Sequence, residues 1–411
     1  MARDLTTRHT LPGASPDPIT KPAGPAPRDG ALPAPVVADV IRVVNDPGHP
    51  AWMRQIRRIG GCAHPLHLTG YTVRRDPTTG HVVQEHSSND YPGSVVLVAC
   101  GNRREIACPA CSRVYHADVF HLVRAGLLGG KSVPETVTGH PRIFLTLTAP
   151  GFGPVHTIRT SGNGPQSGRC TPRRATTCPH GVPAACWARH RDDDPLLGTP
   201  LCPDCYDYDG AVIWQASLGT LWRRFVIYLP RHLARAAGLT HPALRSSVRL
   251  SYVKIVEFQR RGLVHVHAVL RADAAPGADS PVQRPPEWVT PALLATAARQ
   301  AASAVHVSVH AAGIGTWDLA WGPQLDVQDI TTPDRDERTG QKIASYIAKY
   351  ATKSTEVTGW TTRTGAEDTP RGAHARRMMA TALALAEHPD LEDLKLGRWA
   401  RHLAFRGHVS S

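Results

Sequence analysis

The feature that most constrains the fold is a pair of β-type runs separated by a short turn. Residues 248–258 and 263–271 are rich in Val and other strand-forming residues, and Gln259-Arg260-Arg261-Gly262 joins them. This pattern predicts an antiparallel hairpin. Further β-type runs occupy residues 143–148 and 324–330, without the regular alternation of βαβ units. We therefore expect an α+β fold, an antiparallel sheet flanked by helices. Helices are expected at residues 117–128, 213–236, 291–309, 374–387 and 391–405.

The second run of the hairpin contains His265-Val266-His267. Residues two apart on a strand project from the same face, so both imidazoles can bind one metal ion. A three-residue turn centred on Arg261 places Glu257 opposite His265, which completes a set of two histidines and one carboxylate. This donor set accepts Mg²⁺ or Mn²⁺ and leaves positions for a phosphate oxygen and water.

Two alternatives remain open for this set. Asp326 or Gln324 on the later strand can replace Glu257 as the third ligand. In a chain with 22 histidines, a single His-x-His is also explained by two packed side chains without a metal.

A predicted helix at residues 341–353 carries Tyr346, Lys349, Tyr350 and Lys353 on one stripe, at three- and four-residue spacing. One explanation of this stripe is an amphipathic helix whose tyrosines lie at the edge of a core and whose lysines are solvated. The stripe also fits a catalytic role, in which one tyrosine attacks a phosphodiester while the lysines stabilise the phenolate and hold flanking phosphates.

The nine cysteines include Cys-Pro-Ala-Cys and Cys-Pro-Asp-Cys pairs. In a reducing compartment such pairs indicate metal binding before disulfides, and four thiolates can close a tetrahedral structural zinc site. The expected Zn²⁺ ligands form two sets: Cys62, Cys100, Cys108 and Cys111, then Cys178, Cys186, Cys202 and Cys205. The competing ligands are His180 or Cys170 in the second set, and His64, His67 and His190 more generally.

The charge of the chain points to an anionic partner. Lys and Arg total 47 against 34 acidic residues, a formal charge of +13, which favours nucleic acid. No apolar run is long enough for a membrane span and no signal peptide is recognisable, so we expect a cytoplasmic protein without a membrane partner.

The expected organisation is a disordered tail (1–35), an N-terminal helix with the first cysteine segment (36–135), a core (136–355) with the second cysteine segment inserted at 165–210, and a linker with C-terminal helices (356–411).

Three segments, in chain order, resemble the three motifs of the HUH endonucleases: Phe144-Leu145-Thr146-Leu147-Thr148, His265-Val266-His267, and Tyr346-x3-Tyr350-x2-Lys353. Longer stretches are similar to the RepSA-type replication initiators of actinobacterial conjugative plasmids. These stretches are residues 201–208 (LCPDCYDY), 257–265 (EFQRRGLVH) and 398–408 (RWARHLAFRGH). The resemblance extends from about residue 50 onward, and relatives of this type are expected to continue beyond His408.

This resemblance implies a nick at a plasmid origin, single-stranded or unpaired at the cut. A tyrosine keeps the 5′ phosphate, and the 3′ hydroxyl primes a host polymerase for rolling-circle replication. Tyr350 is expected to make the first attack and Tyr346 the transfer that ends a round. Gly130-Lys131-Ser132 resembles the end of a phosphate loop, but Ala125 replaces its first glycine, so unwinding is expected from a host helicase.

The second cysteine segment is rich in arginine and offers an additional role in DNA binding. The arginines suited to phosphate contacts are Arg173, Arg174, Arg189 and Arg191. Two other functions remain as alternatives: a zinc-dependent DNA-binding regulator without chemistry, and an HUH transposase or relaxase acting on another element.

Overall fold

The computed structural model of the 411-residue chain describes residues 38, 41, 44–45, 48–105, 107–158, 167–171, 173–275, 282–331, 340–346 and 370–406. The expected tail, residues 1–35, lies outside this part of the chain. The chain forms two compact units, each described here by itself. The smaller comprises Met1–Ile56 and Leu68–Val96, and the larger comprises Arg57–His67 and Leu97–Ser411.

The smaller unit contains a β-hairpin. β2 (Tyr71–Arg75) and β3 (Val82–Ser87) pair antiparallel, and most of their side chains are exposed. Asp76 begins the turn between them, where its carboxylate accepts two backbone N–H hydrogen bonds. α2 (His49–Arg58) begins in this unit and buries Gln55.

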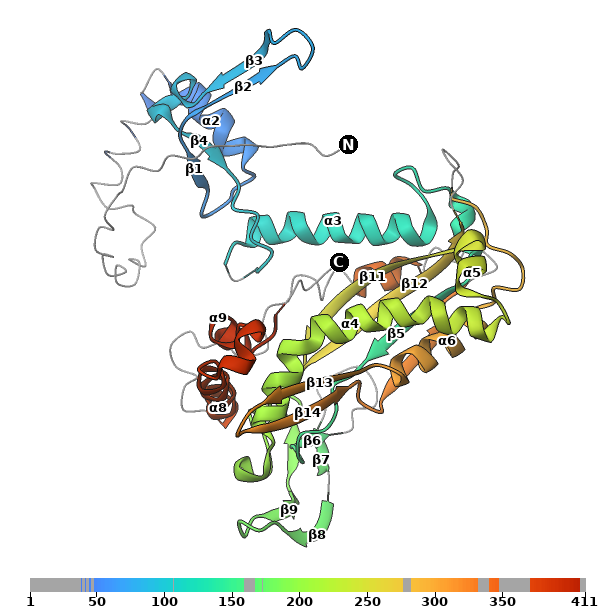
Figure 1. Ribbon diagram of the computed structural model, residues 1–411. Coiled ribbons are helices and arrows are strands. Elements are labelled where there is room, and N and C mark those ends of the chain that lie inside the picture. Colours follow the sequence, from blue (N-terminus) through green and yellow to red (C-terminus); the bar gives the residue numbers. More distant parts are fainter. Residues whose placement is uncertain are drawn as a thin grey trace. The chain divides into compact units, whose positions relative to one another are not determined.

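A four-stranded antiparallel sheet forms the centre of the larger unit (Figure 1). Its strands lie in the order β11 (Val248–Phe258), β12 (Val264–Ala274), β5 (Arg142–Leu147) and β15 (Leu325–Asp329). The Gln259 N–H donates to the Leu263 carbonyl at 2.8 Å, which closes a three-residue turn centred on Arg261. The predicted α+β class and the predicted hairpin are therefore confirmed.

One face of the sheet carries the main core. α4 (Tyr208–Ala236) and α6 (Pro291–Ser303) cover this face (Figure 1). Side chains alternate along a strand, so every second residue of β12 enters this core. The residues that β12 contributes are Val264, Val266, Ala268, Leu270 and Ala272. Trp214 and Phe225 of α4 are fully buried against them.

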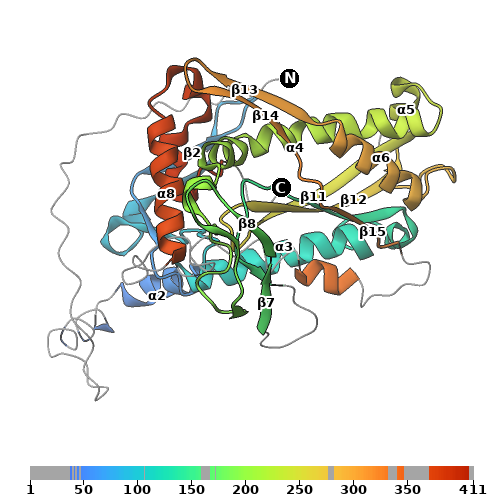
Figure 2. The ribbon, with the colours of Figure 1, turned by 90° about the horizontal axis from the view of Figure 1, so that it is seen from below.

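The opposite face is covered by α3 (Pro109–Leu128) and by the helical residues 340–346. Val123 of α3 and Ala344 share a small apolar cluster with Val269 of β12. Figure 2 shows the strands lying between α3 and α4. The remaining β12 residues, including both histidines of the predicted site, point to the α3 side.

A buried ionic network lies on the α3 side of the sheet. The Asp273 carboxylate is 2.8 Å from His140 Nδ1 and 2.7 Å from Arg271 Nε. Arg271 and Arg142 also donate hydrogen bonds to carbonyl oxygens in the last turn of α3. Carbonyl groups in the last turn of a helix lack hydrogen-bond partners within the helix. The two arginines supply these partners and so attach the C-terminal end of α3 to the sheet.

Between β5 and α4 the chain forms an insertion (residues 148–207) of short strands. They are β6 (Thr157–Ile158), β7 (Ser167–Thr171), β8 (Arg173–Thr177), β9 (Pro183–Ala185) and β10 (Arg189–Arg191). β10, β7 and β6 form one sheet, and β8 pairs with β9. Strands this short bury little apolar surface of their own.

Two predicted helices differ from the structure. The helix expected at 291–309 ends at Ser303, and residues 306–311 instead form β13 (His306–Ala311), paired with β14 (Gly315–Ala320). The helix expected at 391–405 is interrupted because Lys395 and Leu403 adopt positive φ angles of 52° and 53°. It consists of η5 (Pro389–Leu394), α9 (Leu396–Trp399) and η6 (Ala400–His402), which follow α8 (Pro370–Leu385).

The remaining elements are short. They are β1 (Leu66–Leu68), η1 (Ser88–Asp90), η2 (Pro92–Ser94), β4 (Val96–Val98), η3 (Glu135–Gly139), η4 (Pro203–Cys205) and α5 (His241–Ser247). No helix in the described part of the chain combines the length and apolarity required to cross a membrane.

Candidate active site and metal-binding clusters

The sheet places the predicted metal ligands on one face through its register. Glu257 of β11 lies directly opposite His265 of β12, as the turn length predicts. His267 lies opposite Thr146 of β5 on its other side. Directly opposed residues share a face, so these four side chains form a polar patch on the α3 side of the sheet.

His267 lies at the centre of this patch. Its Nε2 atom is 3.0 Å from Glu257 Oε2, and its Nδ1 atom is 3.0 Å from Thr146 Oγ1. The Phe144 ring stacks on the imidazole, with 5.8 Å between ring centroids. The ring is thus held by contacts on both nitrogens and on one face, which presents Nε2 toward the carboxylate.

His265 is held neutral beside it. Burial, together with the charges of Arg261 and His267, lowers the pKa of His265 to about 3. A neutral imidazole is the form that binds a metal ion. Gln259 Nε2 lies 2.6 Å from His265 Nδ1, and the two histidine ring centroids are 6.3 Å apart.

Tyr346 reaches the same patch from the helical residues 340–346. Its hydroxyl oxygen lies 3.4 Å from His267 Nε2, and its ring packs edge-on against Phe144. Ala344, two residues earlier, is fully buried in the apolar cluster beneath α3 and anchors this helix to the sheet. Lys349, Tyr350 and Lys353 lie outside the described residues.

The two alternative third ligands lie on β15 and at its start. Asp326 lies opposite Thr146, but it is exposed and accepts a hydrogen bond from Gln328 at 2.7 Å. The Gln324 backbone carbonyl accepts a hydrogen bond from Thr148. Glu257 is the carboxylate in contact with His267. Glu257, His265 and His267 are not among the groups of described residues whose possible ligand atoms all lie within 4.8 Å of one another, so the third ligand stays a prediction.

The first predicted cysteine set converges in space. Cys62, Cys100, Cys108 and Cys111, here called the Cys62 cluster, offer sulfur atoms that all lie within 4.8 Å of one another. Cys108 precedes α3 and Cys111 lies in its first turn, so the helix start fixes the CxxC pair. The exposed residues His64 and His67 are not members of this cluster. These four thiolates could hold a metal such as zinc.

The acidities of these thiols show why a cation fits. A hydrogen bond from the Cys111 backbone N–H, aided by others, lowers the pKa of Cys108 to about 6. Burial and the neighbouring Cys108 raise the pKa of Cys111 to about 12. One sulfur therefore ionises readily, and its charge opposes ionisation of the next. A bound cation removes this repulsion and allows all four thiolates to form.

The second predicted set is only partly assembled. Cys178, Cys202 and Cys205 converge with His180, and we call this group the Cys178 cluster. His180 Nδ1 lies 3.2 Å from Cys205 Sγ. Burial opposes ionisation here, but backbone N–H groups of Val182 and His180 lower the pKa of Cys178 to about 7. His180 thus takes the place that the sequence assigned to Cys186.

Cys186 belongs to a third group, which the sequence did not predict. His156, Cys170, Cys186 and His190, here called the His156 cluster, also lie within 4.8 Å of one another. Cys170 and His190 had been predicted as competing ligands, whereas His156 had not been identified. A single histidine 14 residues before Cys170 carries no spacing signal, and only the folded insertion brings the two together.

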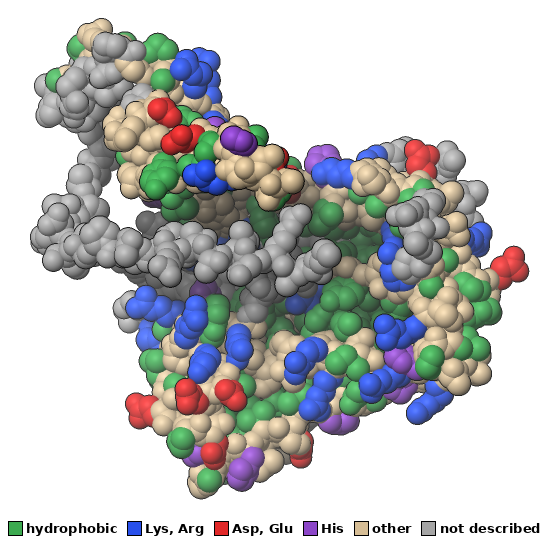
Figure 3. Space-filling model, turned by 45° about the horizontal axis from the view of Figure 1, so that its top comes forward, with side chains coloured by type: hydrophobic (Ala, Val, Ile, Leu, Met, Phe, Trp, Pro, Cys, Tyr) green, Lys and Arg blue, Asp and Glu red, His purple; other side chains and the backbone are tan. Residues whose placement is uncertain are grey.

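The arginines of the insertion differ in their contacts. Arg191 is exposed and pairs with Asp193 at 3.1 Å, and Arg189 donates a hydrogen bond to the Ser167 carbonyl oxygen. The side chains of Arg173 and Arg174 lie outside the described part. Figure 3 shows Lys and Arg side chains in several groups over one face of the molecule, in keeping with the net positive charge.

Comparison with known proteins identifies relatives of this chain. A family model described as "Replication initiator protein, pSAM2" (RepSA) matches residues 48–411. The chain is also 41% identical over 396 residues to a "Replication initiator protein" of Streptomyces ambofaciens, which covers 93% of this chain and 80% of the relative. No solved structure matches the chain. Since the family model spans most of the sequence, the chain belongs to the RepSA family of replication initiator proteins.

Proposed function

We propose that this replication initiator nicks plasmid origin DNA by tyrosine transesterification of the HUH type. The phenolic oxygen of the tyrosine forms a bond to phosphorus as the bond from phosphorus to the 3′ oxygen breaks. The phenol loses its proton, and the departing 3′ oxygen gains one. The 5′ phosphate stays on the tyrosine, and the free 3′ hydroxyl primes rolling-circle synthesis.

The observation that carries this proposal is the contact between Tyr346 and His267, at 3.4 Å from hydroxyl to Nε2. A tyrosine hydroxyl beside a His–Glu pair on a sheet face combines a nucleophile with groups that orient it. Tyr350, four residues later, is the second nucleophile in this proposal and makes the first attack, with Tyr346 performing the terminating transfer. Lys349 and Lys353 hold the flanking phosphates.

The donor set beside Tyr346 suits Mg²⁺ or Mn²⁺. His265, His267 and Glu257 supply two imidazole nitrogens and one carboxylate from one face of the hairpin. When bound there, the ion supplies Lewis-acid polarisation of the scissile phosphate. The chain itself orients the donors: Thr146 and Phe144 fix the His267 ring, and Gln259 fixes His265.

Zinc has a different part in this proposal. The Cys62 and Cys178 clusters hold Zn²⁺ as a structural ion, because closed sets of four Cys and His ligands leave no position for substrate. Unwinding and synthesis come from a host helicase and a host polymerase.

The deciding experiment uses labelled single-stranded origin DNA with the full chain and Mn²⁺. We expect a covalent protein–DNA adduct that survives denaturation. Replacing both tyrosines by phenylalanine (Tyr346→Phe with Tyr350→Phe) should abolish the adduct while DNA binding remains. An adduct formed by the double variant, or none formed by the natural chain, would overturn the proposal.

A non-catalytic, zinc-dependent DNA-binding regulator is the alternative from another class. It predicts binding without an adduct and no effect of either tyrosine substitution. An HUH transposase or relaxase predicts the same adduct on DNA of another element. Comparing cleavage of the plasmid origin with cleavage of unrelated single-stranded DNA distinguishes this alternative from a replication initiator. The family match favours the origin.

A further inference from the structure

The His156 cluster has the donor chemistry of a closed zinc site. It offers two thiolates and two imidazoles, all within 4.8 Å of one another. Cys170 is fully buried, and His190 is nearly so. The three clusters together contain all nine cysteines of the chain, so no cysteine is left outside a potential ligand set. Two Cys and two His that can coordinate one ion tetrahedrally are a common ligand set for structural zinc.

The cluster joins the pieces of a sheet too small to be stable alone. Its ligands come from β7 (Cys170), β10 (His190), the residue before β6 (His156) and the residue after β9 (Cys186). The sheet β10-β7-β6 has strands of three, five and two residues. A metal that binds all four ligands ties these strands together in place of an apolar core.

A second contact orients one of the ligands. His190 Nε2 lies 3.4 Å from Cys186 Sγ, inside the cluster, while His190 Nδ1 lies 2.7 Å from Asp194 Oδ2. A carboxylate on the outer nitrogen is the usual partner of a metal-bound histidine, because it fixes the ring and raises its basicity. Asp194 Oδ1 in turn accepts the backbone N–H of Leu196 at 2.8 Å. The cluster therefore determines the path of the chain after Asp194.

The segment that follows Asp194 leads to the turn of the β11–β12 hairpin. The Gly198 N–H donates to the His156 carbonyl at 2.8 Å. Gly198 has a φ of +90°, and a Cβ atom placed there would lie 2.0 Å from the carbonyl oxygen of Arg260. The segment after Asp194 thus packs directly against the β11–β12 turn. Arg261, the centre of that turn, donates hydrogen bonds back to the carbonyls of Ala149 and Pro150 at 2.9 Å.

We propose that His156, Cys170, Cys186 and His190 bind a third Zn²⁺ ion, and that this ion holds residues 194–198 against the β11–β12 turn. The ion is thereby a positioning element for the hairpin that carries Glu257, His265 and His267. It is distinct from the Cys62 and Cys178 clusters, because neither of those contributes a ligand to it.

Metal content tests the first half of this proposal without any DNA. Elemental analysis of the purified full chain should give three zinc ions per chain. His156→Ala should lower the count by one, whereas His156→Cys should keep three, because a thiolate replaces the imidazole. No loss of zinc in His156→Ala would overturn the third site, whatever the total in the natural chain. Because no nicking is measured, this result is independent of the proposed reaction.

Hydrogen exchange tests the second half. The amides of residues 260–264 should exchange faster in His156→Ala than in the natural chain. Cys178→Ser is the matched control, since it removes a ligand of the neighbouring cluster and should leave these amides protected. Gly198→Ala should keep three zinc ions yet expose the same amides, because its methyl group displaces the Arg260 carbonyl. Unchanged exchange in His156→Ala would show that the ion does not hold the turn. Unchanged exchange in Gly198→Ala would show that residues 194–198 do not protect it.

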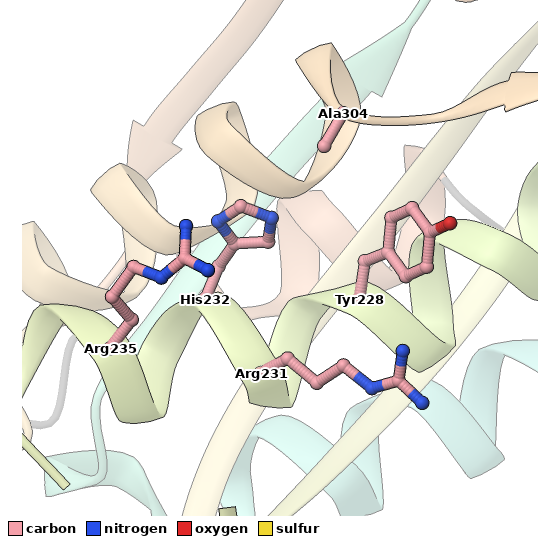
Figure 4. A pocket seen from close by; sticks show the side chains of 5 residues that line it. All are labelled: Tyr228, Arg231, His232, Arg235 and Ala304. Carbon is pink, nitrogen blue, oxygen red and sulfur yellow. The ribbon is translucent and has the colours of Figure 1, made fainter. Parts of the chain in front are cut away.

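A separate observation concerns a pocket on α4. Tyr228, Arg231, His232 and Arg235 line it from one face of the helix, with Ala304 at the end of α6 on the far side (Figure 4). Its volume is about 210 Å³, and no acidic side chain lines it. Arg231 and Arg235 are exposed, and they lie one helical turn apart. Arg235 lies beside His232, whereas Arg231 extends toward Tyr228, with its Cζ atom 5.9 Å from the ring centroid (Figure 4). Two guanidinium groups spaced along one helix face suit the phosphates of a nucleic-acid backbone.

We infer that this pocket contacts a phosphate of the DNA backbone. The occupant is DNA because the chain belongs to a family of replication initiators and carries a net charge of +13. The pocket lies on the helix that covers the sheet face opposite the histidines. It therefore contacts a stretch of DNA other than the nucleotide at the tyrosine, and it supplies affinity without sequence readout.

Salt dependence of binding tests this inference. Binding of a duplex of unrelated sequence is followed by fluorescence anisotropy at several salt concentrations. Arg231→Ala with Arg235→Ala should flatten the slope of log K against log salt by about 0.9 for each lost contact. Lys395→Ala with Arg406→Ala removes the same charge from exposed sites elsewhere and should leave the slope unchanged. An unchanged slope in the pocket variant, or an equal loss in the control, would overturn the inference.

Discussion

The hydroxyl of Tyr346 lies 3.4 Å from Nε2 of His267, although 79 residues separate the two in the sequence. The contact depends on two independent anchors. The register of β12 against β5 fixes His267, and the burial of Ala344 fixes the helix that carries Tyr346. A change at either anchor should therefore alter the site without touching its reactive atoms.

The two candidate carboxylates can be separated by substitution. Glu257→Gln should lower the rate of adduct formation at least about 10-fold, because it removes the carboxylate in contact with His267. Asp326→Asn is the matched control on β15, at the other edge of the sheet, and it should have little effect. Both are measured with labelled single-stranded origin DNA under single-turnover conditions. The opposite ranking would show that Asp326 is the ligand.

Loss of the Asp273 carboxylate should destabilise the larger unit. Asp273→Asn leaves Arg271 buried without its counter-charge, and breaking a buried pair of this kind costs on the order of 3 kcal/mol. Urea denaturation followed by tryptophan fluorescence measures the change in the free energy of unfolding. Asp193→Asn breaks only the exposed pair with Arg191 and should cost less than about 1 kcal/mol. Equal effects would contradict the role given to the buried network.

Acid should weaken the same network in a defined pH window. Burial opposes ionisation of Asp273, but hydrogen bonds from His140 and Arg271 prevail and lower its pKa to about 2. An unfolded Asp has a pKa of about 3.9, so the folded state binds fewer protons between these values. The contribution of Asp273 to stability is therefore complete above about pH 4 and is lost as the pH falls toward 2. Unfolding free energies measured across this range should decline less steeply in Asp273→Asn than in the natural chain.

Zinc content should distinguish the ligands of the Cys62 cluster from the exposed histidines nearby. Cys62→Ser removes one of four thiolates and should lower the zinc count by one ion per chain. His64→Ala and His67→Ala should retain the full count, because neither residue belongs to the cluster. Zinc loss in a histidine variant, with none in Cys62→Ser, would reassign the ligands.

The hairpin was predictable because its determinants are local. The length of the turn sets the register, and the register alone places Glu257 opposite His265. The structure also brings together the four cysteines of the Cys62 cluster, which are spread over 50 residues, and the CxxC pair Cys108 and Cys111 was the local signal for this grouping. The RepSA-type resemblance, drawn from three short segments, was confirmed by the family match.

The ligand exchange in the insertion was not predictable from spacing. Cys186 and His180 lie within six residues of each other, and either fits a four-ligand set with Cys178. Their separation into two clusters depends on how β7, β9 and β10 fold back on one another, which is a tertiary property. The strand β13 was mistaken for helix because the predicted Ala-rich helix before it was extended too far. Val307 and Val309 alternate with His and Ser along β13, which is a strand pattern, and the strand pairs with β14.

The distribution of the nine cysteines has a chemical consequence for the whole molecule. Every one of them lies in a cluster that could hold a metal. A disulfide within this chain can therefore form only by removing ligands from such a cluster, and oxidation is coupled to loss of a bound ion. With its clusters loaded, the protein has no spare thiol to absorb an oxidant, so the first oxidative damage is also a structural change.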